Sequence, residues 1–199
     1  MLRKLLALTT ACVFAATALA QAPLTRIRGK IATLEGQVLT VDTREGTKVD
    51  VTLGNPLSVF TVKPVPLTDV RPGTYVGIAS RTGANGHAEA LEVLVFPEAM
   101  RGAGEGHYSW DLEPGSMMTN GNITAAVAAK SGRDLTLTYK GGTTDIDVPP
   151  GAPIVTLAPA ERSDLKPGAP VMLGAAKAAD GKLTASRVTV GTNGVAPPM

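Results

Sequence analysis

The feature that most constrains the fold of this chain is an internal duplication. The segment LTDVRPGTYVGIAS at residues 67–80 recurs as RSDLKPGAPVMLGA at residues 162–175, an offset of 95 positions. At the same offset, Asn85-Gly86 is replaced by Asp180-Gly181. Self-similarity at one fixed spacing is the sequence signature of a repeated structural unit. The sequence therefore predicts two similar units.

Each unit contains short stretches of alternating apolar and polar residues, separated by Gly, Pro, Asn and Asp. In residues 26–31, for example, Ile27, Gly29 and Ile31 fall on one side of a strand, while Arg26, Arg28 and Lys30 fall on the other. Such alternation indicates strands, and Asn-Gly or Asp-Gly between strands indicates tight hairpins. No long helical periodicity follows residue 20.

We predict an all-β protein made of two tandem small OB-like β-barrels joined by a long ordered connector. A pair of small β-sandwich or SH3-like barrels is the alternative. The expected division of the chain is a signal peptide (1–20), a first barrel (21–96), a connector (97–118), a second barrel (119–191) and a C-terminal tail (192–199).

The first twenty residues have the pattern of a secretory signal peptide. Arg3 and Lys4 form a basic start, an apolar run follows, and Ala18-Leu19-Ala20 is a small-residue cleavage site. The apolar run is shorter than the roughly 20 residues of a membrane-spanning helix, and the residues before Cys12 make a poor lipobox. We expect cleavage after Ala20, export to the periplasm and no transmembrane segment in the mature chain.

Cysteine and charge exclude several classes of function for the mature chain. Cys12 is the only cysteine and lies in the signal, so a disulfide, a thiolate metal site and a cysteine nucleophile are all excluded. The whole chain has 19 Lys and Arg against 17 Asp and Glu. Without Arg3 and Lys4 the two counts are equal, so no basic excess remains to attract nucleic acid.

The repeated pattern resembles a known bacterial family. The elements are V-x-V, then D-[VL]-[RK]-P-G-x-x-V-x-x-x-A, then [ND]-G and A-x-x-V-x-V, and they are similar to the family called domain of unknown function 5666. The resemblance covers residues 27–96 and 121–190 and implies an exported protein built from repeats. The central FPEAMRGAGEGHYSWDL and SMMTN resemble a subgroup in which some proteins are labelled "metal ABC transporter permease". The resemblance implies no catalytic residues.

The connector collects the rarest residues of the chain, but they do not predict an enzyme. Its glycines at 102, 104 and 106 lack the spacing and the Lys of a phosphate-binding loop, so they indicate a bent connector. His107, Ser109 and Asp111 would line one face of a single strand. A catalytic triad needs side chains that converge in space, so we predict no catalytic residues.

Methionine and histidine in the connector suggest a soft-metal site. Met100, His107, Met117 and Met118 lie within 19 residues in an exported protein, and thioether and imidazole ligands suit Cu(I). The alternative is that these methionines fill gaps in a core. Copper is therefore the alternative cofactor, and no cofactor is the first expectation.

Tyr108 and Trp110 are candidates for binding a partner, because Tyr and Trp dominate interface hot spots. If buried, they would instead clasp the connector across the barrels. We therefore expect an exported, non-catalytic binding or accessory protein of the cell envelope. Its partner would be an envelope protein or a small ligand. The alternative function is periplasmic copper binding through His107 and the connector methionines.

Overall fold

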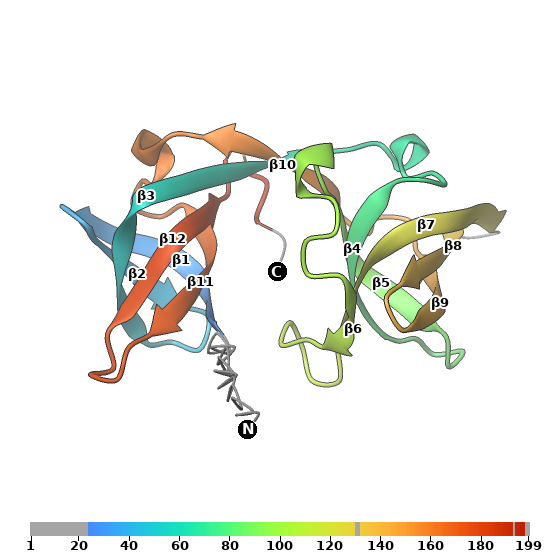
Figure 1. Ribbon diagram of the computed structural model, residues 1–199, viewed down its shortest axis with the longest axis horizontal. Coiled ribbons are helices and arrows are strands. Elements are labelled where there is room, and N and C mark those ends of the chain that lie inside the picture. The colour runs from blue at the N-terminus through green and yellow to red at the C-terminus, as the bar shows by residue number, and fades with distance from the viewer. Residues whose placement is uncertain (1–23, 130–131, 193, 198–199) are drawn as a thin grey trace, which may run out of the picture.

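The chain forms an all-β protein, as predicted (Figure 1). The computed structural model describes residues 24–129, 132–192 and 194–197, so the predicted signal peptide lies outside the described residues. The strands belong to one 12-stranded sheet. Three 3-10 turns, η1 (Leu67–Asp69), η2 (Glu98–Met100) and η3 (Arg162–Asp164), connect some of the strands.

The strands follow one another as β1 (Thr25–Glu35), β2 (Val38–Thr43), β3 (Lys48–Pro64), β4 (Tyr75–Thr82), β5 (Ala88–Val95), β6 (Gly106–Ser109), β7 (Met117–Ala129), β8 (Gly132–Tyr139), β9 (Gly142–Val148), β10 (Ile154–Ala160), β11 (Pro170–Lys177) and β12 (Leu183–Val190).

Five strands from the two ends of the chain close into a barrel, which we call the terminal ring. Its order is β1-β2-β3-β12-β11, and β11 returns to pair with β1. The β3–β12 pairing is parallel and the others are antiparallel. Alternate residues of these strands point inward and form one apolar core that includes Leu39, Val51 and Val188, each fully buried. Burying each such side chain stabilises the fold by about 1.5–3 kcal/mol.

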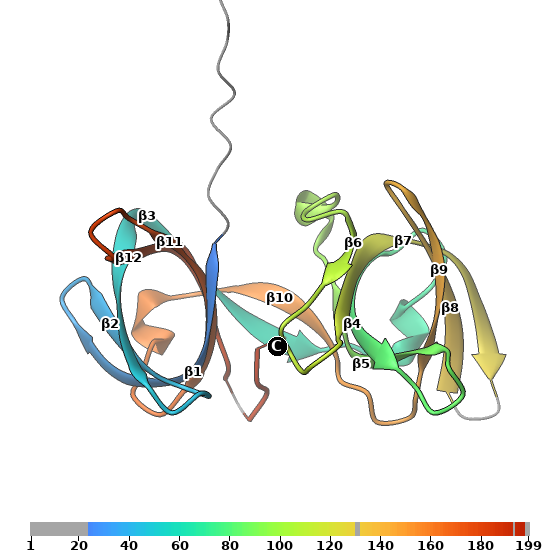
Figure 2. The same ribbon diagram turned by 90° about the horizontal axis from the view of Figure 1, so that it is seen from below.

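Five strands from the middle of the chain form a second cycle, which we call the central ring. Its order is β4-β5-β9-β8-β7, with β7 returning to β4. The ring closes between β5 and β9 by a short parallel pairing, in which Ala88 pairs with Ile146 and Glu89 with Asp147. The core of this ring is separate from the first and includes Ile78, Leu135 and Leu137. Figure 2 shows the two rings side by side.

The strands do not group as the predicted tandem division requires. The central ring is one continuous stretch, from β4 at Tyr75 to β9 at Val148, whereas the terminal ring combines β1–β3 with β11–β12. The expected boundaries at 21–96 and 119–191 therefore cut through both rings. The duplication explains how this is possible: Val76 and Val93 are buried in the central ring, and their repeat counterparts Val171 and Val188 are buried in the terminal ring.

Two long segments carry the chain between the rings. β3 pairs within the terminal ring up to Thr61 and pairs with β10 from Val59 to Pro64. β10 in turn pairs with β5 of the central ring. The two crossing strands thus join the rings in one sheet (Figure 1).

The predicted hairpin turns are confirmed. Gly86 and Gly181 have φ values of 83° and 86°, the left-handed region that glycine tolerates best. They join β4 to β5 and β11 to β12. The predicted connector is ordered and contains η2 and the short strand β6, which pairs with β7.

Candidate binding cleft

An apolar cleft of about 190 Å³ lies between the two rings. Its walls come from β4, β5, β6 and β7 on the central side and from β11 and β12 on the terminal side, with β10 contributing Leu157. A cavity of about 150 Å³ lined by apolar side chains binds benzene. The cleft is therefore large enough for one ring-sized or short-chain group.

Alternation along β4 shapes the central wall. Val76 and Ile78 point into the ring core, so Gly77 and Ala79 face outward into the cleft. A Cβ at Gly77 would lie 2.5 Å from Asn120 Oδ1 and 3.0 Å from Phe96 Cε2. The missing side chain at Gly77 therefore allows Asn120 and Phe96 to approach the strand.

The pairing of β6 with β7 places aromatic and thioether side chains on the same wall. Tyr108 lies directly opposite Met118, and residues in this relation share one face of a sheet. Both line the cleft, together with Trp110 just after β6 and Met100 of η2. Burial raises the pKa of the Tyr108 hydroxyl, against the opposing effect of Arg26, so Tyr108 stays neutral and can donate a hydrogen bond.

Asn120 presents a buried acceptor at this wall. Its Nδ2 donates to the carbonyl oxygen of Gly104 at 2.9 Å and to Tyr108 Oη at 3.1 Å. The carbonyl can only accept, which fixes the amide orientation. Asn120 is 6% exposed, and its Oδ1 has no hydrogen-bond partner among the described residues. A buried polar atom without a partner costs about 1–3 kcal/mol, which a donor on a ligand would recover.

The terminal wall adds cationic groups to apolar ones. Met172 on β11 and Thr189 on β12 are register partners, and both line the cleft. β11 lies between β12 and β1, and Met172 also pairs with Arg28 on β1. The side chains of Arg28 and Met172 therefore lie on the same face of the ring. Arg187 also lines the cleft.

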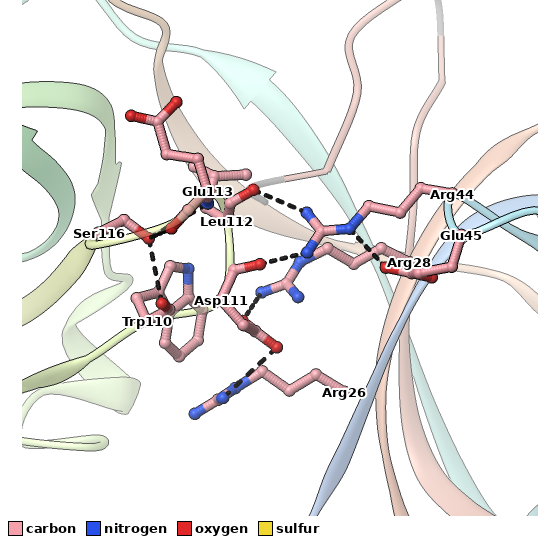
Figure 3. A network of polar contacts seen from close by, with 9 residues as sticks. All are labelled: Arg26, Arg28, Arg44, Glu45, Trp110, Asp111, Leu112, Glu113 and Ser116. Atoms are coloured by element: carbon pink, nitrogen blue, oxygen red, sulfur yellow. Dashed lines mark hydrogen bonds and ion pairs between the residues drawn. The ribbon is translucent and has the colours of Figure 1, made fainter.

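The connector reaches across to these arginines (Figure 3). The Arg26 guanidinium lies 4.0 Å from the centroid of the Trp110 ring. Asp111 forms ion pairs with Arg28, at 2.8 Å, and with Arg26, at 3.7 Å. Arg44 donates to the carbonyl oxygens of Asp111 and Leu112. We call these contacts between residues 110–112 and the three arginines the connector latch.

The carboxylate of Asp111 is stabilised in its charged form by the latch. Partial burial acts to raise the pKa of Asp111, but the ion pair with Arg28 and the charge of Arg26 outweigh it, and the net pKa is lowered. Asp111 therefore remains ionised at neutral pH and to well below it.

The predicted metal ligands do not converge. His107 is exposed, contacts Thr119 Oγ1 through Nδ1 at 2.8 Å and stacks on Tyr139. It lies on the face of β6 and β7 opposite the cleft, and Met117 shares that face, whereas Met118 and Met100 line the cleft. The alternation of side chains along two paired strands thus divides the four residues into two sets.

The three residues His107, Ser109 and Asp111 form no triad, in agreement with the sequence analysis. His107 contacts Thr119, and Asp111 extends to Arg28 on the terminal ring. Gly102, Gly104 and Gly106 of the connector have φ values of 84°, 62° and 147°, as a bent chain requires.

Tyr108 and Trp110, predicted as either a partner-binding pair or a clasp, are both partly buried and line the cleft. Trp110 also contacts arginines of the terminal ring. Trp110 thus both contacts the terminal ring and lines the cleft, so its position is compatible with either prediction.

Sequence reasoning missed most residues of the walls, among them Glu92, Asn120, Met172 and Arg187, and it also missed Arg28, which lies beside Met172. They lie on ordinary strands, away from the cluster of rare residues. One signal was present, since Arg26, Arg28 and Lys30 alternate with apolar residues and so had to share one outer face of β1. Nothing in the sequence indicated that this face would meet the connector.

Among the described residues, no three His, Cys, Asp or Glu side chains gather as a metal site of those ligands would need. Within the same residues, no helix has the length and apolar character to cross a bilayer. No protein-family profile, curated protein or solved structure matches the chain.

Proposed function

We propose that this protein is an exported, non-catalytic binding protein of the cell envelope. Its ligand would be a small, mainly apolar molecule held in the cleft between the rings. The observation that carries the proposal is the combination, in one cleft, of apolar walls with the buried acceptor Asn120 Oδ1. Ligand sites typically combine an apolar lining with a few polar groups that fix orientation.

The same topology supports an OB-like assignment for each ring. In the terminal ring, the first strand β1 pairs with the second strand β2 and with β11, and the third strand β3 runs parallel to β12. A 3-10 turn, η3, precedes β11. We infer OB-like barrels that have exchanged their last two strands, a form of strand swapping within one chain.

Trp110 provides the test of ligand binding, because it is the only tryptophan and lines the cleft. Benzyl alcohol and benzamide are neutral, ring-sized and able to donate a hydrogen bond to Asn120. We expect each to change the Trp110 fluorescence in a saturable manner. In Leu94→Phe the larger side chain fills the cleft, so the affinity should fall by about tenfold or more.

The matched control is Val127→Phe, which also enlarges an apolar side chain, at a β7 position that is 61% exposed and does not line the cleft. This variant should bind both probes like the wild type. Absence of a saturable change in the wild-type protein, or equal loss of binding in both variants, would contradict the proposed function.

A soft metal ion is the second candidate ligand. Met100, Met118 and Met172 bring three thioethers to the cleft, and thioethers suit Cu(I). This set replaces His107 and Met117 of the sequence prediction with Met172. Under the proposal, Cu(I) titration against a competing chelator should show binding that is lost in Met172→Leu and kept in His107→Ala.

The reverse result would favour the original ligand set, with His107. If the wild-type protein does not compete with the chelator, copper binding is excluded for both sets.

A further inference from the structure

We propose that the ligand of the cleft is an amphipathic organic acid, about the size of benzoate, whose carboxylate binds Arg28. This inference rests on the proposed function, since it names the chemical class of the molecule held in that cleft. The apolar body would lie among the aromatic and thioether side chains, and the acid group would take the position that Asp111 now occupies.

The first support is the state of Arg28. Its side chain is 3% exposed, and neither Nε nor Nη2 has a hydrogen-bond partner among the described residues. Nη2 lies 2.8 Å from Asp111 Oδ1 and forms an ion pair with it, whereas Nε has no carboxylate within ion-pair distance among the described residues. A buried guanidinium is normally hydrogen-bonded through several of its five donors. Arg28 therefore has donor capacity that the single contact with Asp111 leaves unused, and a carboxylate placed to accept from two donors would bind it more fully.

The second support is where Arg28 points. Its register partner Met172 lines the cleft, and its guanidinium lies 5.3 Å from the Trp110 ring, which also lines the cleft. A ligand that packs an apolar group against Trp110 and Met172 would thus bring an attached acid group close to Arg28. A carboxylate can accept two parallel hydrogen bonds from a guanidinium, which makes this pairing strong and directional.

The third support is the charge balance of the connector latch. Among the described residues, the three guanidinium groups of Arg26, Arg28 and Arg44 form ion pairs with two carboxylates, those of Asp111 and Glu45. Asp111 is 46% exposed and belongs to the connector. It can therefore leave Arg28 when a ligand carboxylate arrives. We infer that Asp111 acts as an internal substitute for the acid group of the ligand.

The test compares benzoate with benzamide, which have the same shape and differ in charge. Binding is followed by Trp110 fluorescence, excited where neither probe absorbs, and by calorimetry. Wild-type protein should bind benzoate at least about tenfold more tightly than benzamide. Arg28→Gln should lose this preference. Lys30→Gln removes the same charge from the same face of β1 and should keep it.

Asp111→Asn provides an independent measurement on a variant that retains Arg28. Removal of the internal competitor should raise the affinity for benzoate severalfold and leave that for benzamide unchanged. Thermal melts establish that each variant is folded.

Equal binding of benzoate and benzamide by the wild-type protein would overturn the inference and leave the proposed function intact. An unchanged benzoate affinity in folded Asp111→Asn would also overturn it. If neither probe binds, the proposed function itself fails, and the inference fails with it.

Discussion

At the scale of single residues, the arginines of β1 explain why the connector packs against the terminal ring. Arg28 carries a full charge at a position that is 3% exposed. Removing a charge from water costs several kcal/mol unless an opposite charge lies close by. Asp111 supplies that charge from the connector, and Trp110 covers Arg26 with its ring face. The latch therefore ties the connector to a strand that lies about 80 residues away in the chain.

The lowered pKa of Asp111 gives a prediction for stability against pH. A carboxyl whose folded pKa is depressed stabilises the fold above its unfolded pKa, near 3.8, and this stabilisation is lost as the pH falls through the folded pKa. Asp111→Asn should therefore lower the melting temperature at pH 7, by about 2–4 °C for a loss on the order of 1 kcal/mol. The difference from the wild type should shrink on acidification.

Melting curves of both proteins from neutral to strongly acidic pH measure this difference. Asp42→Asn is the control, because Asp42 pairs with Lys48 where both side chains are more than half exposed. It should change the melting temperature little at any pH. A constant difference between Asp111→Asn and wild type across the pH range would contradict the role of the latch.

At the residue scale, the sequence allowed only a minority of the cleft residues to be predicted. Met100, Met118, Tyr108 and Trp110 stood out because rare residue types gather in one stretch, and all four line the cleft. Asn120 and Met172 could not be identified in this way, because their importance arises from strand register. Only the pairing of β1 with β11 brings Arg28 next to Met172.

At the scale of elements, alternation and turn chemistry predicted the strands and hairpins well. The route of the chain between them was not predictable from the same signals. The duplication gives equivalent strands the same buried face: Val93 in β5 and Val188 in β12 are both fully buried. Either β5 or β12 could therefore close either ring. The outcome depends on β3, which continues past Leu53 to Pro64 and delivers the chain to the other ring.

Crossing of β3 and β10 also creates the cleft. In a tandem arrangement each half of the sequence would form its own ring. No crossing strands would then hold the outer faces of β4 and β11 opposite each other. Here Gly77 on β4 and Met172 on β11 line one cleft, although they are repeat counterparts at an offset of 95. The two walls are thus equivalent faces of two related rings, with different side chains on each.

At the scale of the whole molecule, the two rings depend on each other unequally. The central ring is one continuous stretch, so it can form while the terminal strands are unfolded. The terminal ring must bring β1–β3 together with β11–β12 across about 100 residues, a closure that costs about 4.7 kcal/mol when that segment is unstructured. A folded central ring lowers this cost, because β3 leads into its first strand, β4, and β10 follows its last strand, β9, so the intervening segment is already compact.

This asymmetry predicts different effects for matched core substitutions. Leu39 in the terminal ring and Leu135 in the central ring are both fully buried, and Leu→Ala at such sites costs about 2–5 kcal/mol. Leu39→Ala should increase hydrogen exchange in β1–β3 and β11–β12 only. Leu135→Ala should increase it in both rings, because loss of the central ring restores the long loop within the terminal one. Hydrogen-exchange mass spectrometry distinguishes the two patterns, and changes confined to the mutated ring in both variants would show that the rings are independent.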